Sequence, residues 1–209
     1  GKIATKTVKE GLALANGIRL TKSLANKPAN LCTPTILANE AKKLGANHKS
    51  ISVSIMNEAQ MKKLKMNTLL SVAQGTTQPA KLITLQYSNG KKNKKPIVLI
   101  GKGVTFDSGG ISLKPSGAMD EMKYDMAGAA TVLGVFSALP FMGLDTNVIG
   151  IIPATENMPA GNATKPGDVI TSMSGKTVEI LNTDAEGRLI LCDSITYAKK
   201  FKPEVVIDI

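Results

Sequence analysis

The sequence predicts an α/β fold in which a mixed, mainly parallel sheet is covered by helices on both faces. Three observations lead to this prediction. Residues 96–100 form a continuous apolar run, which is typical of a strand buried on both faces. Residues 126–139 are mostly apolar and typical of a helix, and their small residues suit close packing on a sheet. Strand-like and helix-like segments then alternate along the rest of the chain, as they do in folds with parallel strands.

The first part of the chain is expected to be largely helical. Apolar residues recur at roughly helical spacing over residues 5–26, and the run at 27–30, which contains Pro28, ends this helix. Thr33 followed by Pro34 is typical of an N-cap with proline at the first helical position, and predicts a helix to about Leu44. The next expected elements are a strand at 50–56, a short lysine-rich helix at 58–66 and a strand at 82–87.

The second part of the chain carries the α/β pattern. Three buried strands are expected, at 96–100, 147–152 and 178–181. The helices expected between and after them cover residues 126–139 and 187–200. Residues 205–209 are typical of the start of another strand.

The charge balance is strongly basic, with a formal net charge of +10 from 26 lysines and arginines against 16 acidic residues. Such a surplus is found on nucleic-acid-binding surfaces. However, only Arg19 and Arg188 are arginines, and three Tyr, four Phe and no Trp leave few side chains for stacking on bases. We therefore expect a solvated surface without a nucleic-acid partner, and keep a basic nucleic-acid-binding module as an alternative.

Cysteine and histidine usage limits the chemistry. Cys32 and Cys192 are too few for a disulfide framework, so we expect free thiols in a reducing, cytoplasmic compartment. His48 is the only histidine, which excludes a His-rich zinc site and disfavours a nucleophile–histidine mechanism. No signal peptide and no apolar run of about 18 residues is recognised, so no membrane partner is expected.

Acidic residues gather in two segments that follow predicted strands, where α/β folds bind ligands. In an extended segment side chains two apart share a face, so Asp184, Glu186 and Arg188 would point into one cleft. Neighbouring carboxylates repel one another unless a cation compensates, and Asp107 and Asp125 could complete a set of oxygen ligands. Helix caps or surface salt bridges are the alternative, above all for Asp125 at a helix start.

Three basic residues accompany these acids. Lys102 directly follows a buried strand, where a neutral amine beside bound cations could itself ligate a metal. Lys114 lies in the same segment, and solvated lysines are the alternative for both. Arg188 stands out in a lysine-rich chain because its guanidinium suits bidentate capture of a planar oxyanion. A salt bridge at a helix start is the alternative for Arg188.

The motifs around these residues resemble those of the leucyl aminopeptidase, or cytosol aminopeptidase, family of dinuclear metallopeptidases. The resemblance covers nearly the whole chain and is carried by these segments: Asn182-Thr183-Asp184-Ala185-Glu186-Gly187-Arg188-Leu189, residues 101–114 with 122–128, Asn30 with Pro34, and Glu156-Asn157-Met158-Pro159 leading to Pro166-Gly167-Asp168.

This resemblance implies two divalent metal ions, zinc or manganese or else magnesium. Asp107 and Glu186 would bridge the two metals, Asp184 would complete one site, and Lys102 and Asp125 would complete the other. The implied enzyme is a hydrolase that uses a hydroxide bridging the metals to cleave the N-terminal peptide bond. Its substrates would be peptides with a free N-terminus and a leucine-like or other apolar first residue.

The resemblance also implies roles for residues that do not bind metal. Lys114 would lie unligated over the substrate carbonyl, and Arg188 would hold a bicarbonate that serves as general base. Met122 and Asn182 would contact the substrate.

The resemblance further implies a domain organisation. Residues 1–28 would be a connecting helix from an N-terminal domain that this sequence lacks, and residues 29–209 the N-terminal part of a catalytic domain that is truncated at its C-terminal end. The full-length enzyme would be a cytoplasmic homo-hexamer. An inactive fragment of the same enzyme is a further alternative.

Overall fold

The computed structural model describes residues 2–209 and has the predicted mixed α/β architecture. Its main sheet has six strands in the order β1-β2-β5-β3-β8, with β4 paired to the later part of β5. The first two pairings, β1–β2 and β2–β5, are antiparallel, whereas β5–β3, β5–β4 and β3–β8 are parallel. The strands are β1 (Ile51–Met56), β2 (Lys81–Ser88), β3 (Ile97–Ile100), β4 (Gly103–Asp107), β5 (Asn147–Asn157) and β8 (Val205–Asp208).

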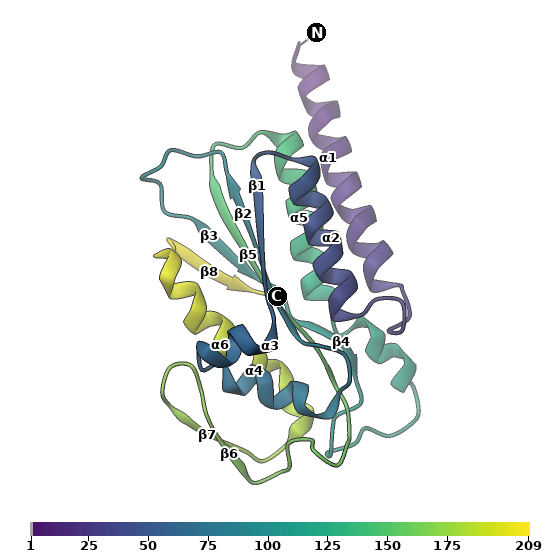
Figure 1. Cartoon of the computed structure of the whole chain (residues 1–209). Helices are drawn as coiled ribbons and strands as arrows, with labels where there is room; N and C mark the ends of the chain where they lie inside the picture. The colour runs from purple at the N-terminus through teal and green to yellow at the C-terminus, as the bar shows by residue number, and fades with distance from the viewer. Residues whose placement is uncertain (1) are drawn as a thin grey trace.

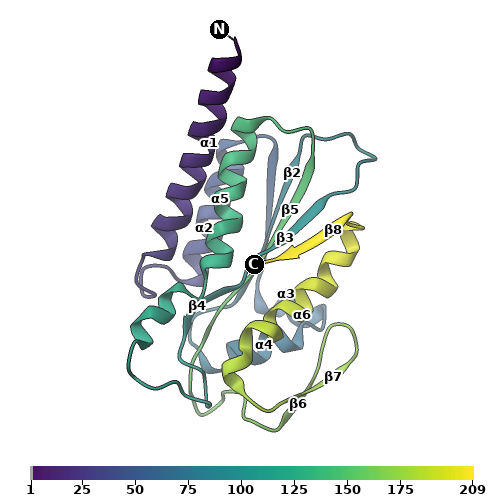
Figure 2. The ribbon, with the colours of Figure 1, turned by 180° about the vertical axis from the view of Figure 1, so that it is seen from behind.

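Helices cover both faces of this sheet, as Figures 1 and 2 show from opposite sides. One face carries α1 (Lys2–Ala25), α2 (Pro34–Asn47) and α5 (Ala127–Met142), and the other carries α3 (Glu58–Lys63), α4 (Asn67–Val72) and α6 (Glu186–Ala198). The short 3₁₀ turns are η1 (Ala73–Gly75), η2 (Met119–Tyr124), η3 (Thr183–Ala185) and η4 (Lys199–Phe201).

Two apolar cores result, because successive side chains of a strand point to opposite faces. On β5, Val148 and Ile152 join the core under α1, α2 and α5, where Phe136 is fully buried. Ile149 and Ile151 of the same strand join the core under α4 and α6. The strand β5 is thus packed between the two apolar cores.

The expected N-terminal helices are present. The first runs over Lys2–Ala25, against the predicted 5–26. The second begins at Pro34, where the Thr33 hydroxyl accepts a hydrogen bond from the backbone N–H of Ile36 at 3.4 Å. The predicted N-cap at Thr33 is therefore confirmed.

The strand predicted at 178–181 does not belong to the main sheet. Thr177–Ile180 is β7, which pairs antiparallel with β6 (Asp168–Thr171) in a separate two-stranded sheet. Only alternate residues point inward, since Thr177 and Glu179 are exposed whereas Ile180 is buried. The interpretation of this segment as a buried strand of the main sheet is wrong, because the run is amphipathic.

Other differences concern short elements. The helix predicted at 58–66 ends at Lys63, because Lys65 adopts a left-handed conformation (φ 58°), and α4 then follows. The strand predicted at 147–152 continues to Asn157 alongside β4. Neither β4, β6 nor α4 is predicted from the sequence.

One stretch is long and apolar enough to cross a membrane by length and composition. Met119–Met142 contains an 18-residue window with a mean hydropathy of 1.4, which contradicts the expectation that no such run is present. Its helix α5 is nevertheless a core element, since Leu133 and Phe136 are fully buried. A core helix passes the same test, so this stretch is weak evidence for a span.

Candidate metal centre

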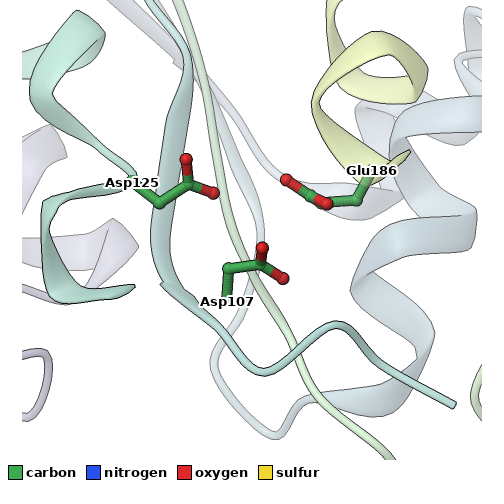
Figure 3. Close-up of side chains that lie close together, drawn as sticks. All are labelled: Asp107, Asp125 and Glu186. Carbon is green, nitrogen blue, oxygen red and sulfur yellow. The ribbon is translucent and has the colours of Figure 1, made fainter. Parts of the chain in front are cut away.

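Three carboxylates converge at the ends of three different elements. Asp107 is the last residue of β4, Asp125 follows η2 just before α5, and Glu186 is the first residue of α6. Each offers an oxygen, and these three oxygens lie within 4.8 Å of one another (Figure 3). Asp107 and Glu186 are only 2% and 1% exposed. The cluster therefore lies inside the protein, where solvent screens its charges poorly.

Lys102 contacts two of these carboxylates. It follows β3, and its Nζ lies 2.7 Å from Asp125 Oδ1 and 2.8 Å from Glu186 Oε1. Gly187 makes room for it, because a Cβ at that position would lie 2.9 Å from Lys102 Cε. Asp125 thus pairs with Lys102, and the first turn of α5 has no side-chain cap.

Lys114 links Asp184 to the same cluster. Its Nζ lies 2.9 Å from Asp107 Oδ2 and 2.5 Å from Asp184 Oδ1. Four carboxylates thus surround two ammonium groups, which leaves two formal negative charges without a compensating cation when all are ionised. Lys114 lies among the carboxylates here, whereas the resemblance implies an unligated position over the substrate.

Several oxygens of this cluster lack hydrogen-bond partners within residues 2–209. Asp125 Oδ2 and Glu186 Oε2 are buried without any donor, and Glu186 Oε1 and Asp184 Oδ1 meet only the two ammonium groups. Buried polar atoms without partners are costly, all the more when they carry charge. Carboxylate oxygens are the ligands expected of a divalent-cation site, and the amine of Lys102 lies beside them. The residues present therefore fit a divalent cation.

The cluster shifts the pKa values of its members. Burial acts to lower the pKa of Lys102, but hydrogen bonds and charge from Asp125 and Glu186 outweigh it, so the pKa is raised. The pKa of Lys114 is likewise raised by Asp184 and Asp107 against the effect of burial. Burial raises the pKa of Asp125 to about 7, with Lys102 opposing the shift and Glu186 and Asp107 adding to it. Both amines are therefore ammonium groups beside these carboxylates.

Two polar side chains for which the sequence predicts no role support the carboxylates. Asn157 donates a hydrogen bond to Asp107 Oδ1 at 2.8 Å, and Thr183 donates one to the carbonyl of Gly109 at 2.7 Å. Asn157 belongs to a segment that carries the family resemblance, but no role is predicted for it, because the strand that carries it is expected to end five residues earlier. A polar residue at the carboxyl end of a buried strand is the signal that could have found it.

The extended-strand argument does not apply to Arg188. Residues 183–185 form η3 and Glu186 opens α6, so side chains two apart do not share a face. Arg188 is exposed and lines a groove of about 220 Å³ with Leu181 and Asn182. The expectation that Asp184, Glu186 and Arg188 share one face of an extended strand is therefore wrong.

The two residues expected to contact substrate belong to the segments that precede Asp125 and Asp184. Asn182 is exposed, and its side chain caps η3 by accepting a hydrogen bond from the N–H of Asp184 at 2.8 Å. Met122 is half-buried in η2, three residues before Asp125.

Comparison with known proteins shows the family to which this chain belongs. A sequence model of the catalytic domain of the cytosol aminopeptidase family matches residues 19–209. The "Probable cytosol aminopeptidase" of Paraburkholderia phymatum is 60% identical over the whole chain, and that of Azoarcus sp. (strain BH72) is 61% identical over 97% of it. The chain spans 41% and 40% of the length of these two relatives.

Solved structures agree with the sequence comparison. The bottromycin maturation enzyme BotP in complex with Mn is 39% identical, with a TM-score of 0.88 over 95% of this chain and 44% of that one. Another structure of BotP gives a TM-score of 0.87 at 38% identity, over 95% of this chain and 42% of that one. With the family model matching far more than half of its residues, the chain belongs to the cytosol aminopeptidase family.

Proposed function

We propose that the protein is a metal-dependent aminopeptidase that hydrolyses the N-terminal peptide bond of peptides with a free N-terminus. We further propose two divalent cations at the site and a preference for leucine-like or other apolar first residues. Membership of the cytosol aminopeptidase family supports the activity. The observation that carries the proposal is the cluster of Asp107, Asp125 and Glu186, whose oxygens lie within 4.8 Å of one another beside Lys102.

The proposed ligands divide between the two cations. Asp107 and Glu186 would contact both, Asp184 would complete one position, and Asp125 with Lys102 would complete the other. Manganese, zinc and magnesium are the candidate ions; an oxygen-rich donor set suits manganese or magnesium, and a BotP structure holds Mn. When bound, such cations supply Lewis-acid polarisation of a carbonyl and a water of lowered pKa.

Protein groups would contribute the remaining steps. Lys114 pairs with Asp107 and Asp184. Once cations take over these carboxylates, its ammonium would donate a hydrogen bond to the oxyanion that develops at the scissile carbonyl. Arg188 would hold a bicarbonate as general base. Within this chain, the only histidine is His48, which follows α2 and packs against Phe141. Met122 and Asn182 would contact the substrate.

The organisation of the whole protein is also a proposal, since the chain spans about two fifths of its relatives' length. Residues 1–28 would connect to an N-terminal domain, and residues 29–209 would begin the catalytic domain. We propose a cytoplasmic homo-hexamer. The relatives' names, "Probable cytosol aminopeptidase", support the location.

The experiment that tests the activity compares a free and a blocked amine. The intact protein, loaded with Mn²⁺, is assayed on leucinamide and on N-acetyl-leucinamide, each with and without EDTA. We expect hydrolysis of leucinamide only, and its loss on chelation. Equal hydrolysis of the acetylated substrate, or activity that survives complete removal of metal, would contradict the proposal.

A further inference from the structure

Asn157 contacts two segments that carry carboxylates of the cluster: the end of β4, with Asp107, and the turn at 183–186, with Asp184 and Glu186. It is the last residue of β5, and its Cα is paired with that of Asp107 across the parallel β4–β5 ladder. Its side chain is almost fully buried, at 4% exposed. The amide Nδ2 donates two hydrogen bonds, to Asp107 Oδ1 at 2.8 Å and to the carbonyl of Thr183 at 3.0 Å. A single amide group therefore contacts both segments.

Thr183 extends this connection. Its hydroxyl donates to the carbonyl of Gly109 at 2.7 Å and accepts from the N–H of Ser112 at 2.8 Å. The Ser112 hydroxyl in turn accepts from the N–H of Thr183 at 3.1 Å. Because Thr183 directly precedes Asp184 and lies three residues before Glu186, these bonds fix the start of the turn that presents both acids.

The same contacts decide which oxygen of Asp107 faces the cluster. Asp107 Oδ1 accepts from Asn157 and from the N–H of Gly109 at 2.9 Å, whereas Oδ2 faces Lys114 at 2.9 Å. There is little space around this arrangement. Gly110 has a φ of +69°, and a Cβ there would lie 2.8 Å from Asn157 Oδ1 and 3.0 Å from Thr183 Oγ1. The carboxylate is therefore held in one orientation by a tightly packed amide.

We propose that Asn157 is a positioning residue of the metal centre. It fixes the orientation of the Asp107 carboxylate. Through its hydrogen bond to the carbonyl of Thr183, it also fixes the distance between Asp107 and the turn that carries Asp184 and Glu186. This inference rests on the proposed function, because it concerns the same site. Groups that orient metal ligands through hydrogen bonds commonly change metal affinity by about 10–100-fold when removed.

The test measures Mn²⁺ affinity by isothermal titration calorimetry and thermal stability by circular dichroism on the intact protein. Asn157→Ala removes both donors, and Asn157→Leu removes them while keeping a branched side chain of similar shape in place of the amide. We expect both variants to bind Mn²⁺ at least about tenfold more weakly. Asn147→Ala is the matched control, because Asn147 begins the same strand and donates from Nδ2 to two backbone carbonyls, those of Lys91 and Lys94.

The control separates positioning from general stabilisation. Asn147→Ala should lower the Tm as the Asn157 variants do, yet keep wild-type Mn²⁺ affinity. Wild-type affinity in both Asn157 variants, with only the Tm lowered, would overturn the inference and leave the proposed metal centre intact. A wild-type protein that binds no Mn²⁺ would overturn the proposed function, and this inference with it.

Discussion

Asp107 and Glu186 are nearly inaccessible to water, and each lies within reach of an ammonium group. Changing either to its amide keeps the shape of the side chain but removes the charge that a cation needs. We expect Asp107→Asn and Glu186→Gln each to abolish activity and to lower the bound metal. Metal content by mass spectrometry and turnover are measured on the same preparation of intact protein.

Glu204→Gln is the control for these two variants, because Glu204 is exposed and lies just before β8, away from the cluster. It should retain both metal and turnover. Wild-type metal content and turnover in either of the two site variants would defeat the proposed bridging roles.

Asp125 gives the metal-free protein a distinct pH dependence. Burial, with the charges of Glu186 and Asp107, raises its pKa to about 7 from an ordinary 3.8. Between these values the folded protein binds a proton that the unfolded chain has released, so this group lowers the free energy of unfolding as pH rises. Asp125→Asn should remove that contribution. Urea denaturation in EDTA across this range measures it, and an unchanged pH profile in the variant would show that Asp125 is not responsible.

Arg188 tests the proposed bicarbonate site. Arg188→Lys keeps the charge but loses the planar fork that binds an oxyanion through two hydrogen bonds. We expect kcat to fall while metal occupancy persists, because Arg188 is not one of the proposed metal ligands. Parallel loss of metal and kcat would instead make Arg188 a structural residue.

At the scale of elements, the first turn of α6 is shaped around Lys102. A Cβ at Gly187 would lie 2.9 Å from Lys102 Cε and 3.0 Å from its Nζ, so the flexible amine would have to move. Gly187→Ala should therefore weaken Mn²⁺ binding, although alanine favours the helix itself by about 1 kcal/mol. Titration calorimetry with Mn²⁺ and a urea unfolding curve measure the two effects separately.

Gly11→Ala is the matched control, since Gly11 also lies within a helix and a Cβ there would meet nothing within 4 Å. It should gain stability without any change in metal affinity. Equal Mn²⁺ affinity in Gly187→Ala and the wild-type protein would mean that the position of Lys102 does not affect the site.

Elements with strong local signals could be predicted from the sequence. Thr33 with Pro34 marks the start of α2, and the apolar run at 96–100 marks β3, because a cap and a continuous apolar run are local patterns. The amphipathic strand β7 could not be assigned to its sheet, since pairing with β6 depends on residues elsewhere in the chain. The extension of β5 to Asn157 likewise depends on β4.

The same distinction applies to the candidate site. The sequence points to Asp107, Asp125 and Glu186, and the structure brings their oxygens together. Strand periodicity predicts that Asp184 and Arg188 share a face. This argument fails, because residues 183–185 form η3 and α6 begins at Glu186. The hydrogen bonds of Asn157 join residues far apart in sequence, and no local pattern encodes them.

For the whole molecule, the site exists only because both helical layers pack on one sheet. Asp125 comes from the layer that contains α5, Glu186 from the layer that contains α6, and Asp107 from the sheet between them. Figure 3 shows the three side chains approaching from these separate elements. Misalignment of either layer would separate the carboxylates, so correct packing of the two cores is a condition for the site.

The most direct test of this centre is anomalous diffraction from crystals of the intact protein grown with Mn²⁺. We predict two anomalous peaks about 3.5–4 Å apart, surrounded by the carboxylates of Asp107, Asp125, Asp184 and Glu186, with Lys114 Nζ displaced from its two carboxylate partners. The absence of any peak among these carboxylates, with Lys102 and Lys114 still in their ion pairs, would contradict the proposed metal centre.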